Sequence, residues 1–577
     1  MPADRAAVDG PCLGVFDGTH DAGAAVVLHG RLLAAVSEER LVRDKGAAGW
    51  PHHSVAAVLD AAGLRPADLR AVAFAGRVNP NPALRLARGA QARWRFDDRG
   101  MWDPSTLRDR LAEATQLQSP FPRLRSDSAA AQLWTPPVRW ALAHRLQTQL
   151  PGLQAPISID DHHRCHAAAA WHTFGVERGL VIVADGVGDG QALTVWRGEG
   201  ATLQPVLAWP FPHSHGLVYA TLTAILGFRP FRHEGKVAGL AAHGDADAVP
   251  VPWPFVGPPL ARRLACGLGP GLRAALAPLR GCQRQDVCAW LQRGLEDDLC
   301  GLLDALLAAH GLSDVALCGG VFANVRLNQR MAERPGLRRL WIFPHMGDGG
   351  LAAGAALIAS GGAPVALRSA ALGPDLQPAE LATALRAAPE PRAPASPHAL
   401  AERLRAGALL AVCQGRSEFG PRALGQRSIL ACPADPAVVD RLNASLQRSP
   451  FMPFAPAVRA EDVNEAVELA APALDAARFM TVTAQATPAL RAAAPAVVHA
   501  DGSARVQVVH ADEAPLLHAI LTAYRDQGGG PALLNTSFNL HEEPIVQTAA
   551  NALRSWRAAR LDALLLDDTL LVQPPPR

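Results

Sequence analysis

Apolar runs alternate with short glycine-containing turns in three segments of the chain, and each segment predicts a strand that leads into a turn. In residues 13–36, the runs LGVF and AAVV flank the turn DGTHDAG. In residues 180–196, LVIVA precedes DGVGDG and QALTVW follows it. In residues 315–330, the run VALC leads through two glycines into a helical pattern. Apolar runs bounded by such turns are typical of hairpins and meanders.

Similarity between the first two segments predicts an internal duplication. Both follow an apolar strand with a turn that contains aspartate and glycine. The two halves of an actin- or sugar-kinase-like nucleotide-binding domain begin in this way, and their paired turns hold phosphates through backbone N–H groups. Because such turns are also common in surface hairpins, it is the repetition that favours this interpretation. We therefore predict an α/β domain built from two duplicated halves.

Length and composition indicate more than one domain. At 577 residues the chain is too long for one ordinary core. Composition shifts to Ala, Pro and Gly in the stretch that we interpret as a linker, 366–397. The duplicated domain then spans 1–365, and a second domain spans 398–577. Residues 80–150 are rich in Arg, Trp and Ala and are broken by Pro, which indicates an insertion of helices and loops.

The overall composition excludes several classes of protein. Hydrophobic residues make up 49% of the chain and charged residues 19%, as in a well-packed globular protein. The net charge of +2 argues against a nucleic-acid binder with a broad basic face. The nine cysteines form no CxxC pair, so we expect reduced thiols rather than a zinc site or a disulfide framework. With no leader pattern and no long apolar stretch, we expect a cytoplasmic protein without a membrane span.

Two histidines in the stretch DHHRCHAAAAW are candidate metal ligands. His162 and His166 are four residues apart, so on a helix they point along one face, where two imidazoles suit one metal ion. Packed or surface histidines are the alternative. Asp348 lies in a glycine-rich turn that opens an Ala/Leu helix, which makes it either a third ligand or a helix cap. Two imidazoles and one carboxylate leave open coordination positions, as Lewis-acid chemistry requires.

A glycine pair follows the third apolar strand. Gly319 and Gly320 lack a Cβ, so the backbone there can approach a flat or phosphorylated ligand. Asn324 and Asn328 lie on successive turns of the helix that follows. A glycine pair alone is weak evidence, and its position after a buried strand in the same domain strengthens it.

Two polar motifs mark the second domain. The stretch GRSEFGPRALGQRSIL places Arg416, Arg422 and Arg427 among hydroxyls and glycines. Three guanidiniums in this setting predict a bidentate anion clamp that suits phosphates, whereas a solvated loop would more often use Lys and Glu. The stretch LLNTSFNLHEEPIV offers neutral hydrogen-bonding groups for an amide or a ribose. They are Asn535, Thr536, Ser537 and Asn539.

Taken in chain order, these motifs resemble the carbamoyltransferase family of antibiotic biosynthesis and nodulation-factor decoration. The resemblance covers almost the whole chain. In the first domain it includes GTHDAGAAVVLHGRLLAAVSEERLVRDK, HHRCHA, DGVGD, SHGLVYATLTAILGF, EGKVAGLAAHG, LCGGVFAN and PHMGDGG. In the second it includes GRSEFGPRALGQRSI, PFAPAV, HADGSARVQ and LLNTSFN. Members of this family join a Kae1-like domain to an α+β YrdC-like domain.

The resemblance implies an O-carbamoyltransferase that uses carbamoyl phosphate and ATP. It implies that the second domain forms carbamoyl-adenylate, with magnesium accompanying ATP. The residues implied there are Arg416, Arg422, Arg427, Arg505, Asn535, Ser537 and Asn539. The adenylate would then move to the first domain, where a cation held by His162, His166 and Asp348 anchors it. The resemblance points to iron(II), and magnesium, manganese and zinc stay open.

The resemblance also implies how the first domain transfers the carbamoyl group to a small hydroxylated acceptor. His20 is implied as the general base on the acceptor hydroxyl, since an imidazole ordinarily titrates near pH 6.5. Acceptor specificity is expected from loops such as 80–150, and the sequence does not define the acceptor. The residues implied to line the nucleotide are Asp185, Asp189, Lys236, Gly319, Gly320 and Asn324.

One stretch departs from the family pattern. Leu446, Ser449 and Met452 occupy positions where members usually carry a lysine, a glutamate and an additional arginine. The change removes two positive charges near the implied carbamoyl phosphate site. Arg441 and Arg448 are the nearby residues that would compensate.

Three other functions compete with this interpretation. A homologue that binds nucleotide without activating carbamoyl phosphate is favoured by the departures just described. Carbamoyl transfer to tRNA is disfavoured by the nearly neutral charge, because tRNA binding normally needs a basic surface. A kinase is disfavoured by the histidine pair, because kinases position magnesium with carboxylates and phosphates. We expect no nucleic-acid or membrane partner, and both a monomer and a homodimer stay open.

Overall fold

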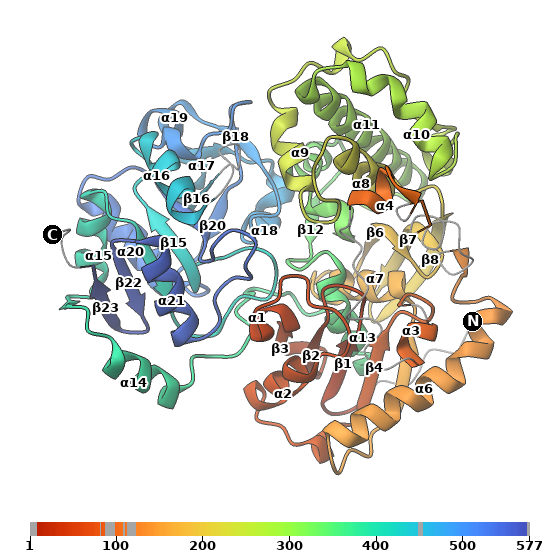
Figure 1. The fold of residues 1–577 in the computed structure, drawn as a ribbon, viewed down its shortest axis with the longest axis horizontal. Helices are drawn as coiled ribbons and strands as arrows, with labels where there is room; N and C mark the ends of the chain where they lie inside the picture. The colour runs from red at the N-terminus through yellow and green to blue at the C-terminus, as the bar shows by residue number, and fades with distance from the viewer. Residues whose placement is uncertain are drawn as a thin grey trace. The chain divides into compact units, whose positions relative to one another are not determined.

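The computed structural model describes residues 8–80, 82–86, 99–107, 110–111, 123–447 and 454–573. The chain divides into two compact units (Figure 1). The first unit comprises Met1–Glu38 and Gly46–Leu367, and the second comprises Glu39–Lys45 and Arg368–Arg577. None of the helices that the structure describes is long and apolar enough to cross a membrane.

A five-stranded sheet of order β3-β2-β1-β4-β5 begins the first unit. The strands β1 (Cys12–Phe16), β2 (Gly23–Leu28) and β3 (Arg31–Ser37) form an antiparallel meander. The strands β4 (Ala71–Ala75) and β5 (Ile157–Asp160) extend the sheet in the direction of β1. Every residue of β1 and β4 is buried, which explains why their sequences read as continuous apolar runs.

A second sheet repeats the first strand for strand, in the order β8-β7-β6-β11-β12. The strands β6 (Arg178–Gly188), β7 (Gln191–Glu199) and β8 (Thr202–Pro210) form the meander. The strands β11 (Asp314–Cys318) and β12 (Arg339–Ile342) run in the direction of β6. The predicted duplication and α/β class are confirmed by this topology.

The turns after the first strand of each meander are also related. Residues 17–21 read DGTHD and residues 185–189 read DGVGD, so both have the pattern D-G-x-x-D. The last aspartate of each turn, Asp21 or Asp189, has a left-handed backbone, with φ of 54° and 47°. Aspartate tolerates this conformation better than most residues, which accounts for its use at both positions.

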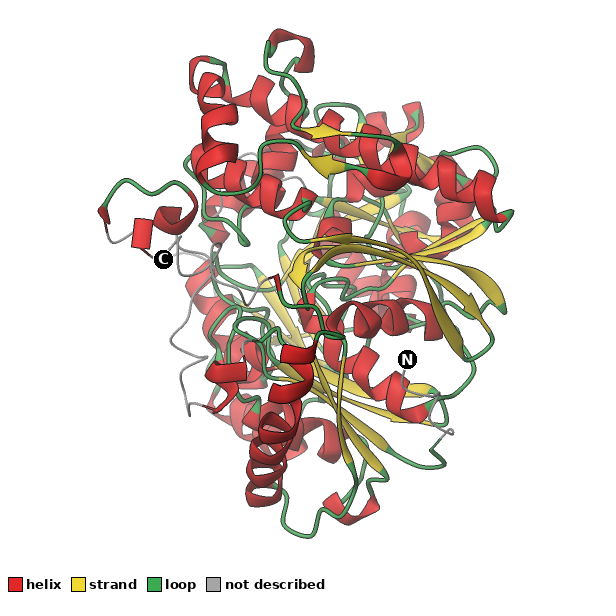
Figure 2. Cartoon of the chain, turned by 90° about the vertical axis from the view of Figure 1, so that its right-hand side faces the viewer, coloured by secondary structure: helices red, strands yellow, loops and turns green. Residues whose placement is uncertain are grey.

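Helices pack against the strands of the first unit (Figure 2). The helix α13 (Leu351–Ser360) packs on β1, β4 and α7 (His162–His172). Both helices are rich in alanine, and a Cβ on Gly354 would lie only 1.8 Å from the carbonyl oxygen of Cys165. Small side chains therefore permit the close approach of α7 and α13, which positions the residues at their N-terminal ends.

The remaining elements of the first unit connect and cover the sheets. Within the predicted insertion, the described helices are α3 (Pro82–Leu86), α4 (Arg99–Trp102) and α6 (Ala129–Gln149). A short hairpin is formed by β9 (Phe255–Val256) and β10 (Arg263–Leu264). The other helices are α2 (His52–Ala61), α8 (His215–Ile225), α9 (Glu234–Ala241), α10 (Pro270–Leu276), α11 (Arg284–His310) and α12 (Val325–Ala332).

The second unit is an α+β unit built on a mixed eight-stranded sheet of order β13-β23-β22-β14-β15-β21-β16-β20. Helices cover the sheet, and residues of α15 and α20 share a core with its strands. The strands are β13 (Arg392–Ala393), β14 (Leu410–Cys413), β15 (Arg427–Ala431), β16 (Ala455–Arg459), β20 (Gln507–Val509), β21 (Ala532–Ser537), β22 (Ala563–Leu566) and β23 (Thr569–Val572).

Smaller elements complete the second unit. A three-stranded sheet contains β17 (Val467–Glu468), β18 (Ala484–Ala486) and β19 (Ser503–Ala504). The helices are α14 (Pro378–Ala387), α15 (Pro397–Arg405), α16 (Ala437–Leu446), α17 (Val463–Ala466), α18 (Leu474–Ala477), α19 (Pro488–Ala493), α20 (Pro515–Asp526) and α21 (Ala549–Ala559).

Two segments differ from the sequence-based expectation. The stretch 366–397, which we interpreted as a linker, contains α14 and the edge strand β13, and almost all of it belongs to the second unit. The segment Glu39–Lys45, which includes most of α1 (Glu38–Val42), also belongs to the second unit. Arg40 donates from Nη2 to the carbonyl oxygen of Gly420 at 2.7 Å, and Arg43 donates to those of Pro544 and Ile545 at 2.6 Å.

Candidate functional site

Four loops of the first unit meet at the carboxyl ends of parallel strands. The turn 17–21 follows β1, α7 follows β5, the turn 185–189 ends β6, and Asp348 lies in the loop after β12. In open α/β sheets, ligands bind outside the carboxyl ends of the strands. The topology therefore brings together polar residues that are far apart in the sequence.

A compact cluster of ligand atoms lies where these loops meet. One atom each from His162, His166, Asp185 and Asp348 all lie within 4.8 Å of one another. The Nε2 atoms of both histidines lie 3.4 Å from Asp348 Oδ1. Asp185 Oδ2 lies 3.3 Å from His162 Nε2 and 3.8 Å from His166 Nε2. The structure thus brings together the three predicted metal ligands, and a fourth candidate joins them.

Local sequence explains how α7 presents its histidines. Asp161 caps the helix, because its carboxylate accepts a hydrogen bond from the backbone N–H of Arg164 at 2.8 Å. His162 and His166 are fully buried, one turn apart on the same face. A Cβ on Gly188 would lie 2.1 Å from the His162 ring, so only glycine fits at that point of the second turn. His163 points elsewhere, with Nδ1 3.1 Å from Thr194 Oγ1.

Asp185 has a different place from the one predicted. We expected it to line a nucleotide, but its Oδ2 faces both histidines and its Oδ1 accepts a hydrogen bond from Gly320 N at 3.0 Å. The available sequence signal was its position at the end of a strand in the duplicated D-G-x-x-D turn. That signal places it at the edge where ligands bind, but does not say which other side chains arrive there.

Charges within the cluster stabilise one another. Burial would lower the pKa of His162, but the charge of Asp348 and a hydrogen bond to Asp185 outweigh burial and raise that pKa to about 10. Burial would raise the pKa of Asp185, but the facing imidazoles of His162 and His166 hold that pKa well below its usual range. The carboxylates therefore favour protonation of the imidazoles, and a cation that binds these nitrogens must displace those protons.

The donor set fits a divalent metal. Within the described part of the chain, His166 Nε2 is buried and makes no hydrogen bond of good geometry. Two imidazole nitrogens and two carboxylate oxygens are ligands that first-row divalent metals accept, including iron(II), manganese and zinc. The cluster is therefore a candidate metal centre whose donors come from α7, β6 and the loop after β12.

Cys318 lies behind this cluster, at the end of β11. Its Sγ is 3.5 Å from His166 Nδ1 and donates a hydrogen bond to the carbonyl oxygen of Met346 at 3.3 Å. The sulfur therefore contacts the ring nitrogen of His166 that faces away from Asp185 and Asp348. Partners of this kind fix the orientation and tautomer of a metal-binding histidine. Sequence analysis missed this contact, because it joins residues of two separate elements.

We expect the Cys318→Ala variant to bind Mn²⁺ or Zn²⁺ about tenfold more weakly than the wild type, because His166 loses the contact that orients it. Cys318→Ser, which restores a polar atom, is expected to recover most of the affinity. Calorimetric titration of the metal checks this, with Cys288→Ala as the control for losing a buried thiol elsewhere in the unit. Equal affinity of Cys318→Ala and wild type would contradict the positioning role.

His20, the predicted general base, lies beside the cluster. Its Nε2 is 3.7 Å from Asp348 Oδ2, and its Nδ1 is 3.0 Å from Asp21 Oδ2. Burial disfavours the charged ring, but the hydrogen bond to Asp21 and the charge of Asp348 raise the pKa of His20 to about 9. This differs from the ordinary value that the sequence argument used, because Asp21 was not considered.

The residues that were predicted to line the nucleotide differ from one another in their surroundings. Gly319 has φ of 101°, and a Cβ there would lie 2.2 Å from the carbonyl oxygen of Ala184, so glycine is required. Gly320 donates its backbone N–H to Asp185. Lys236 is buried on α9, with Nζ 3.4 Å from His233 Nε2. The backbone of Gly319 and Gly320 thus packs against the end of β6 and the turn that carries Asp185.

Two of the predicted nucleotide residues instead support the fold. Asp189 is buried, and its carboxylate accepts four backbone N–H groups, from Arg77, Val78, Asn79 and His162, at 2.8–2.9 Å. It therefore joins the loop after β4 to the start of α7. Asn324 caps α12 through Leu327 N and exchanges hydrogen bonds with the amide of Gln292. Their polar atoms are thus engaged within the protein.

In the second unit, the three arginines of the predicted anion clamp differ in their hydrogen-bond partners. Arg427 is fully buried and donates to the backbone carbonyls of Gln414, Gly415, Gln426 and Gln547, so it stabilises the fold instead of facing an anion. Arg416 donates to the carbonyls of Leu372 and Gly373.

Of the three arginines, Arg422 best fits the prediction of an anion-binding residue. Among the described residues, its buried Nε has no hydrogen-bond partner. Burial lowers its pKa to about 10, because desolvation penalises the charged guanidinium. An anion beside this guanidinium would supply the missing partner.

The two predicted motifs of the second unit lie on adjacent strands. β15 pairs with β21, which places Leu430 opposite Asn535. Asn535 Nδ2 donates to Gln507 Oε1 at 2.7 Å and to the carbonyl oxygen of Ala423, the neighbour of Arg422. Asn539 donates to the carbonyls of Leu540 and Glu543, and Ser537 ends β21. Arg505 precedes Gln507 in the chain. The motifs thus form one polar region.

The stretch that departs from the family pattern gains no charge from Arg441. Arg441 donates to the carbonyl oxygen of Gly407 at 2.7 Å and pairs with Asp562, so it is engaged elsewhere. Leu446 is buried at the end of α16. Ser449, Met452 and Arg448 lie outside the described residues.

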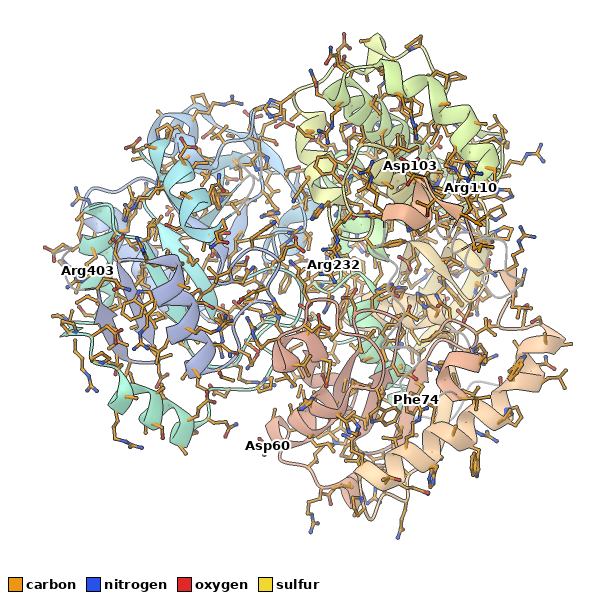
Figure 3. The ribbon with its side chains drawn as sticks, viewed as in Figure 1. Asp60, Phe74, Asp103, Arg110, Arg232 and Arg403 are labelled. Atoms are coloured by element: carbon orange, nitrogen blue, oxygen red, sulfur yellow. The ribbon has the colours of Figure 1, made fainter. Side chains whose placement is uncertain are left out.

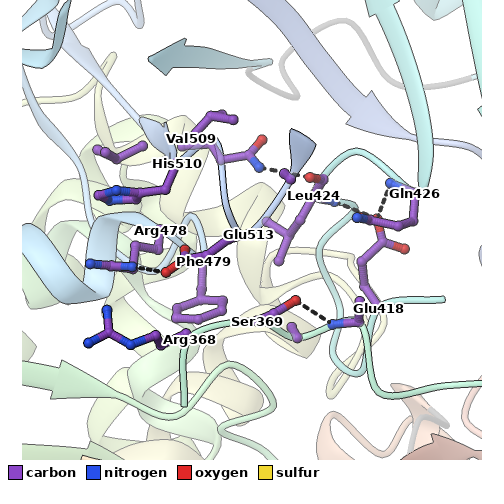
Figure 4. A pocket seen from close by; sticks show the side chains of 15 residues that line it. Arg368, Ser369, Glu418, Leu424, Gln426, Arg478, Phe479, Val509, His510 and Glu513 are labelled. Carbon is purple, nitrogen blue, oxygen red and sulfur yellow. Dashed lines mark hydrogen bonds and ion pairs between the residues drawn. The ribbon is translucent and has the colours of Figure 1, made fainter. Parts of the chain in front are cut away.

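A small pocket that is partly open to solvent lies in the second unit (Figure 4). Gln507 and Leu424 contribute to its wall, so it adjoins the polar region described above. Arg478 pairs with Glu513 within it. Glu418, Leu424 and Gln426, all from the GRSEFGPRALGQRSIL motif, line part of it. Its other charged and aromatic lining residues are Arg368, Phe479 and His510.

Comparisons with known proteins agree across both units. The model of the carbamoyltransferase N-terminus matches residues 12–251 and 271–357, and that of the C-terminus matches residues 401–573. Nodulation protein NolNO of Sinorhizobium fredii is 31% identical over 576 residues, covering 96% of this chain and 79% of that protein. Nodulation protein NolO of Bradyrhizobium diazoefficiens is 33% identical over 446 residues, covering 72% of this chain and 79% of that protein.

Among solved structures, HypF of T. kodakarensis matches with a TM-score of 0.37 and 12% identity, over 61% of this chain and 48% of that one. A likeness at this level adds nothing to the functional argument. The family models together cover most of the chain and include every residue of the cluster. The chain therefore belongs to the carbamoyltransferase family.

Proposed function

We propose that this carbamoyltransferase is an O-carbamoyltransferase that uses carbamoyl phosphate and ATP to form carbamoyl-adenylate and then carbamoylates a hydroxyl of a small acceptor. Activation takes one water and releases inorganic phosphate and pyrophosphate. In the transfer, the acceptor oxygen bonds to the carbamoyl carbon, the bond from that carbon to the phosphate oxygen breaks, and AMP leaves. The observation that carries the proposal is that both family regions are present and each contains its own polar site.

We assign activation to the second unit. Arg422 supplies a buried guanidinium without a protein partner at Nε among the described residues, which suits a phosphate or carbamate oxygen. Asn535 on β21 and Gln507 on β20 hold each other in place through a hydrogen bond of 2.7 Å. Arg427 acts indirectly, by fixing the loop that carries Arg422 through its bonds to backbone carbonyls.

We assign transfer to the first unit, where His162, His166, Asp185 and Asp348 would hold the cation. A divalent cation bound there would draw charge from the phosphate of the leaving group and would offset the carboxylates that raise the pKa of His20. His20 then takes the proton of the acceptor hydroxyl at one ring nitrogen, while Asp21 holds the other nitrogen. The two D-G-x-x-D turns would bind the phosphate side of the adenylate through their backbone N–H groups.

The proposal is tested without an acceptor. The purified protein is incubated with ATP, carbamoyl phosphate, magnesium and iron(II), and carbamoyl-adenylate and pyrophosphate are measured by mass spectrometry. We expect both from the wild type. Arg422→Ala is expected to lower their formation about 100-fold, the usual effect of losing a donor to developing charge.

Arg386→Ala is the control for this experiment, because Arg386 lies on the exposed side of α14 and bonds only locally to Thr383. It should leave both products at the wild-type level. Absence of both products from the wild type with every metal tried would refute the proposal. Full activity of Arg422→Ala would instead show that another group binds the anion.

A further inference from the structure

A buried charged pair lies at the start of α8, outside both sites described above. His215, the first residue of α8, and Asp298 of α11 are 5% and 2% exposed. His215 Nε2 lies 2.9 Å from Asp298 Oδ2. Since Asp298 also pairs with Arg262, its carboxylate is the acceptor and the imidazole N–H is the donor. Side chains fill the space around both helices (Figure 3).

The hairpin β9–β10 encloses this pair. Phe255 on β9 stacks on the His215 ring, with ring centroids 3.8 Å apart and planes 6° from parallel. Trp253 donates from Nε1 to Asp298 Oδ2 at 2.7 Å, and Arg262 Nε lies 2.8 Å from Asp298 Oδ1. A buried carboxylate is stable only where partners compensate its desolvation, so these contacts tie the hairpin to both helices. We call the five residues the brace.

Part of the brace lies outside the family match. The model of the carbamoyltransferase N-terminus leaves out residues 252–270, between its two matched parts. That range contains Trp253, Phe255 and Arg262, whereas His215 and Asp298 lie in the matched parts. The contacts of the brace therefore do not follow from membership of the family.

The first turn of α8 contacts the backbone of Asp185. Ser214, which caps α8, donates from Oγ to the carbonyl oxygen of Asp185 at 3.0 Å. A Cβ on Gly216 would lie 3.0 Å from the same oxygen, so a larger residue there would push the helix away from the strand. The residues on both sides of His215 thus contact a candidate metal ligand, and the brace holds the residue between them.

Strand pairing does not fix the position of Asp185. The strand β6 leaves its register with β7 after Ala184 and resumes it at Gly188. Its pairing with β11 ends at Val183. The backbone of Asp185 therefore lies in an irregular segment, where the contact with α8 takes the place of a ladder hydrogen bond.

We propose that the brace is a positioning device for Asp185: it fixes the first turn of α8, and that turn fixes a ligand on which the cation affinity of the metal centre depends. A ligand that is already held in place loses little conformational freedom when a cation binds. Partners behind the ligands typically change metal affinity by about 10–100-fold. The inference rests on the proposed function, because it uses Asp185 as a ligand of the metal centre.

Calorimetric titration of the full-length protein with Mn²⁺ tests the brace. His215→Phe keeps an aromatic ring against Phe255 but removes the donor to Asp298, and we expect it to bind Mn²⁺ about tenfold more weakly. His215→Gln supplies an N–H donor again and is expected to recover most of the affinity. Ser214→Ala, which removes the hydroxyl that holds Asp185, should show a loss similar to that of His215→Phe.

Ser128→Ala is the matched control for Ser214→Ala. Ser128 also caps a helix, α6, and also donates to a backbone carbonyl, but to that of Arg125. Its removal should leave Mn²⁺ affinity at the wild-type level. An equal loss in Ser128→Ala and Ser214→Ala would overturn the inference, since any lost helix cap would then have the same effect.

A double-mutant cycle separates the positioning of Asp185 from general damage to the unit. With Asp185→Asn in place, the brace has no carboxylate left to position, so adding His215→Phe should weaken Mn²⁺ binding by less than about twofold. An equal loss from His215→Phe in both backgrounds would overturn the inference, because the effect would then not pass through Asp185. Unchanged affinity in both His215→Phe and Ser214→Ala would also overturn it.

The outcomes distinguish the brace from the proposed function. If the wild type binds no Mn²⁺, the metal centre of the proposed function fails, and the brace fails with it. If the wild type binds Mn²⁺ and the cycle shows no coupling, only the brace fails. Circular dichroism checks that each variant is folded. If His215→Phe does not fold, the cycle of Ser214→Ala with Asp185→Asn decides the question in the same way.

Discussion

Asp348→Asn is expected to lower the affinity of the first unit for divalent metal by ~100-fold or more, since the variant removes the carboxylate charge that both histidines face. Asp348 Oδ1 lies 3.4 Å from the Nε2 atoms of His162 and His166. Asparagine keeps the size of the side chain but offers a neutral oxygen. Carbamoyl transfer should be lost with the metal, whereas carbamoyl-adenylate formation, which we assign to the second unit, should continue.

Metal content after dialysis and calorimetric titration check this result. Asp247→Asn is the control, because Asp247 is a largely exposed carboxylate that pairs with Arg293 at the surface. It should bind metal as the wild type does. If Asp348→Asn retained wild-type affinity, Asp348 would be a helix cap and not a ligand, which was the alternative at the outset. If Asp348→Asn also lost adenylate formation, this would contradict our assignment of activation to the second unit and of transfer to the first.

Arg85→Ala is expected to lower the free energy of unfolding of the first unit by about 3–5 kcal/mol, because it leaves a buried carboxylate without its partner. Arg85 and Asp17 are both fully buried, and Arg85 Nη2 lies 2.6 Å from Asp17 Oδ1. Arg85 also donates to the carbonyl oxygens of Ala75 and Gly76. Asp17 begins the turn that carries His20, so the variant should also disorder that side of the site.

Chemical denaturation followed by circular dichroism measures the effect. Combining Arg85→Ala with Asp17→Asn removes both charges, so the double variant should be less destabilised than the sum of the single variants. Arg65→Ala serves as the control, because Arg65 forms an exposed pair with Asp68 and its removal should change little. A small effect of Arg85→Ala would mean that the buried carboxylate finds another partner.

Sequence analysis was most informative where the relevant pattern is local. The spacing of His162 and His166 is a property of one helix, and the duplicated turns are each a few residues long. Such patterns can be read from the chain because a helix or a hairpin fixes its own geometry. The duplication itself was predicted in this way, and the matching strand orders of the two sheets confirm it.

Roles that depend on distant contacts could not be predicted in the same way. Asp185 and Asp189 are four residues apart in one turn, but the first faces the histidines and the second accepts backbone N–H groups from two other segments. Arg427 resembles Arg422 in the sequence. It lies on a central strand, however, and there it bonds to backbone carbonyls. Which polar group faces a ligand is decided by the fold around it.

The segment Glu39–Lys45 has a consequence for how this enzyme can be divided and recombined. A cut at residue 367 would give a second unit without Arg40 and Arg43, so the carbonyl oxygens of Gly420, Pro544 and Ile545 would lose their donors. The second unit is therefore discontinuous in the gene. A chimaera that exchanges it between relatives must carry this N-terminal segment along with the C-terminal one, and natural recombination faces the same constraint.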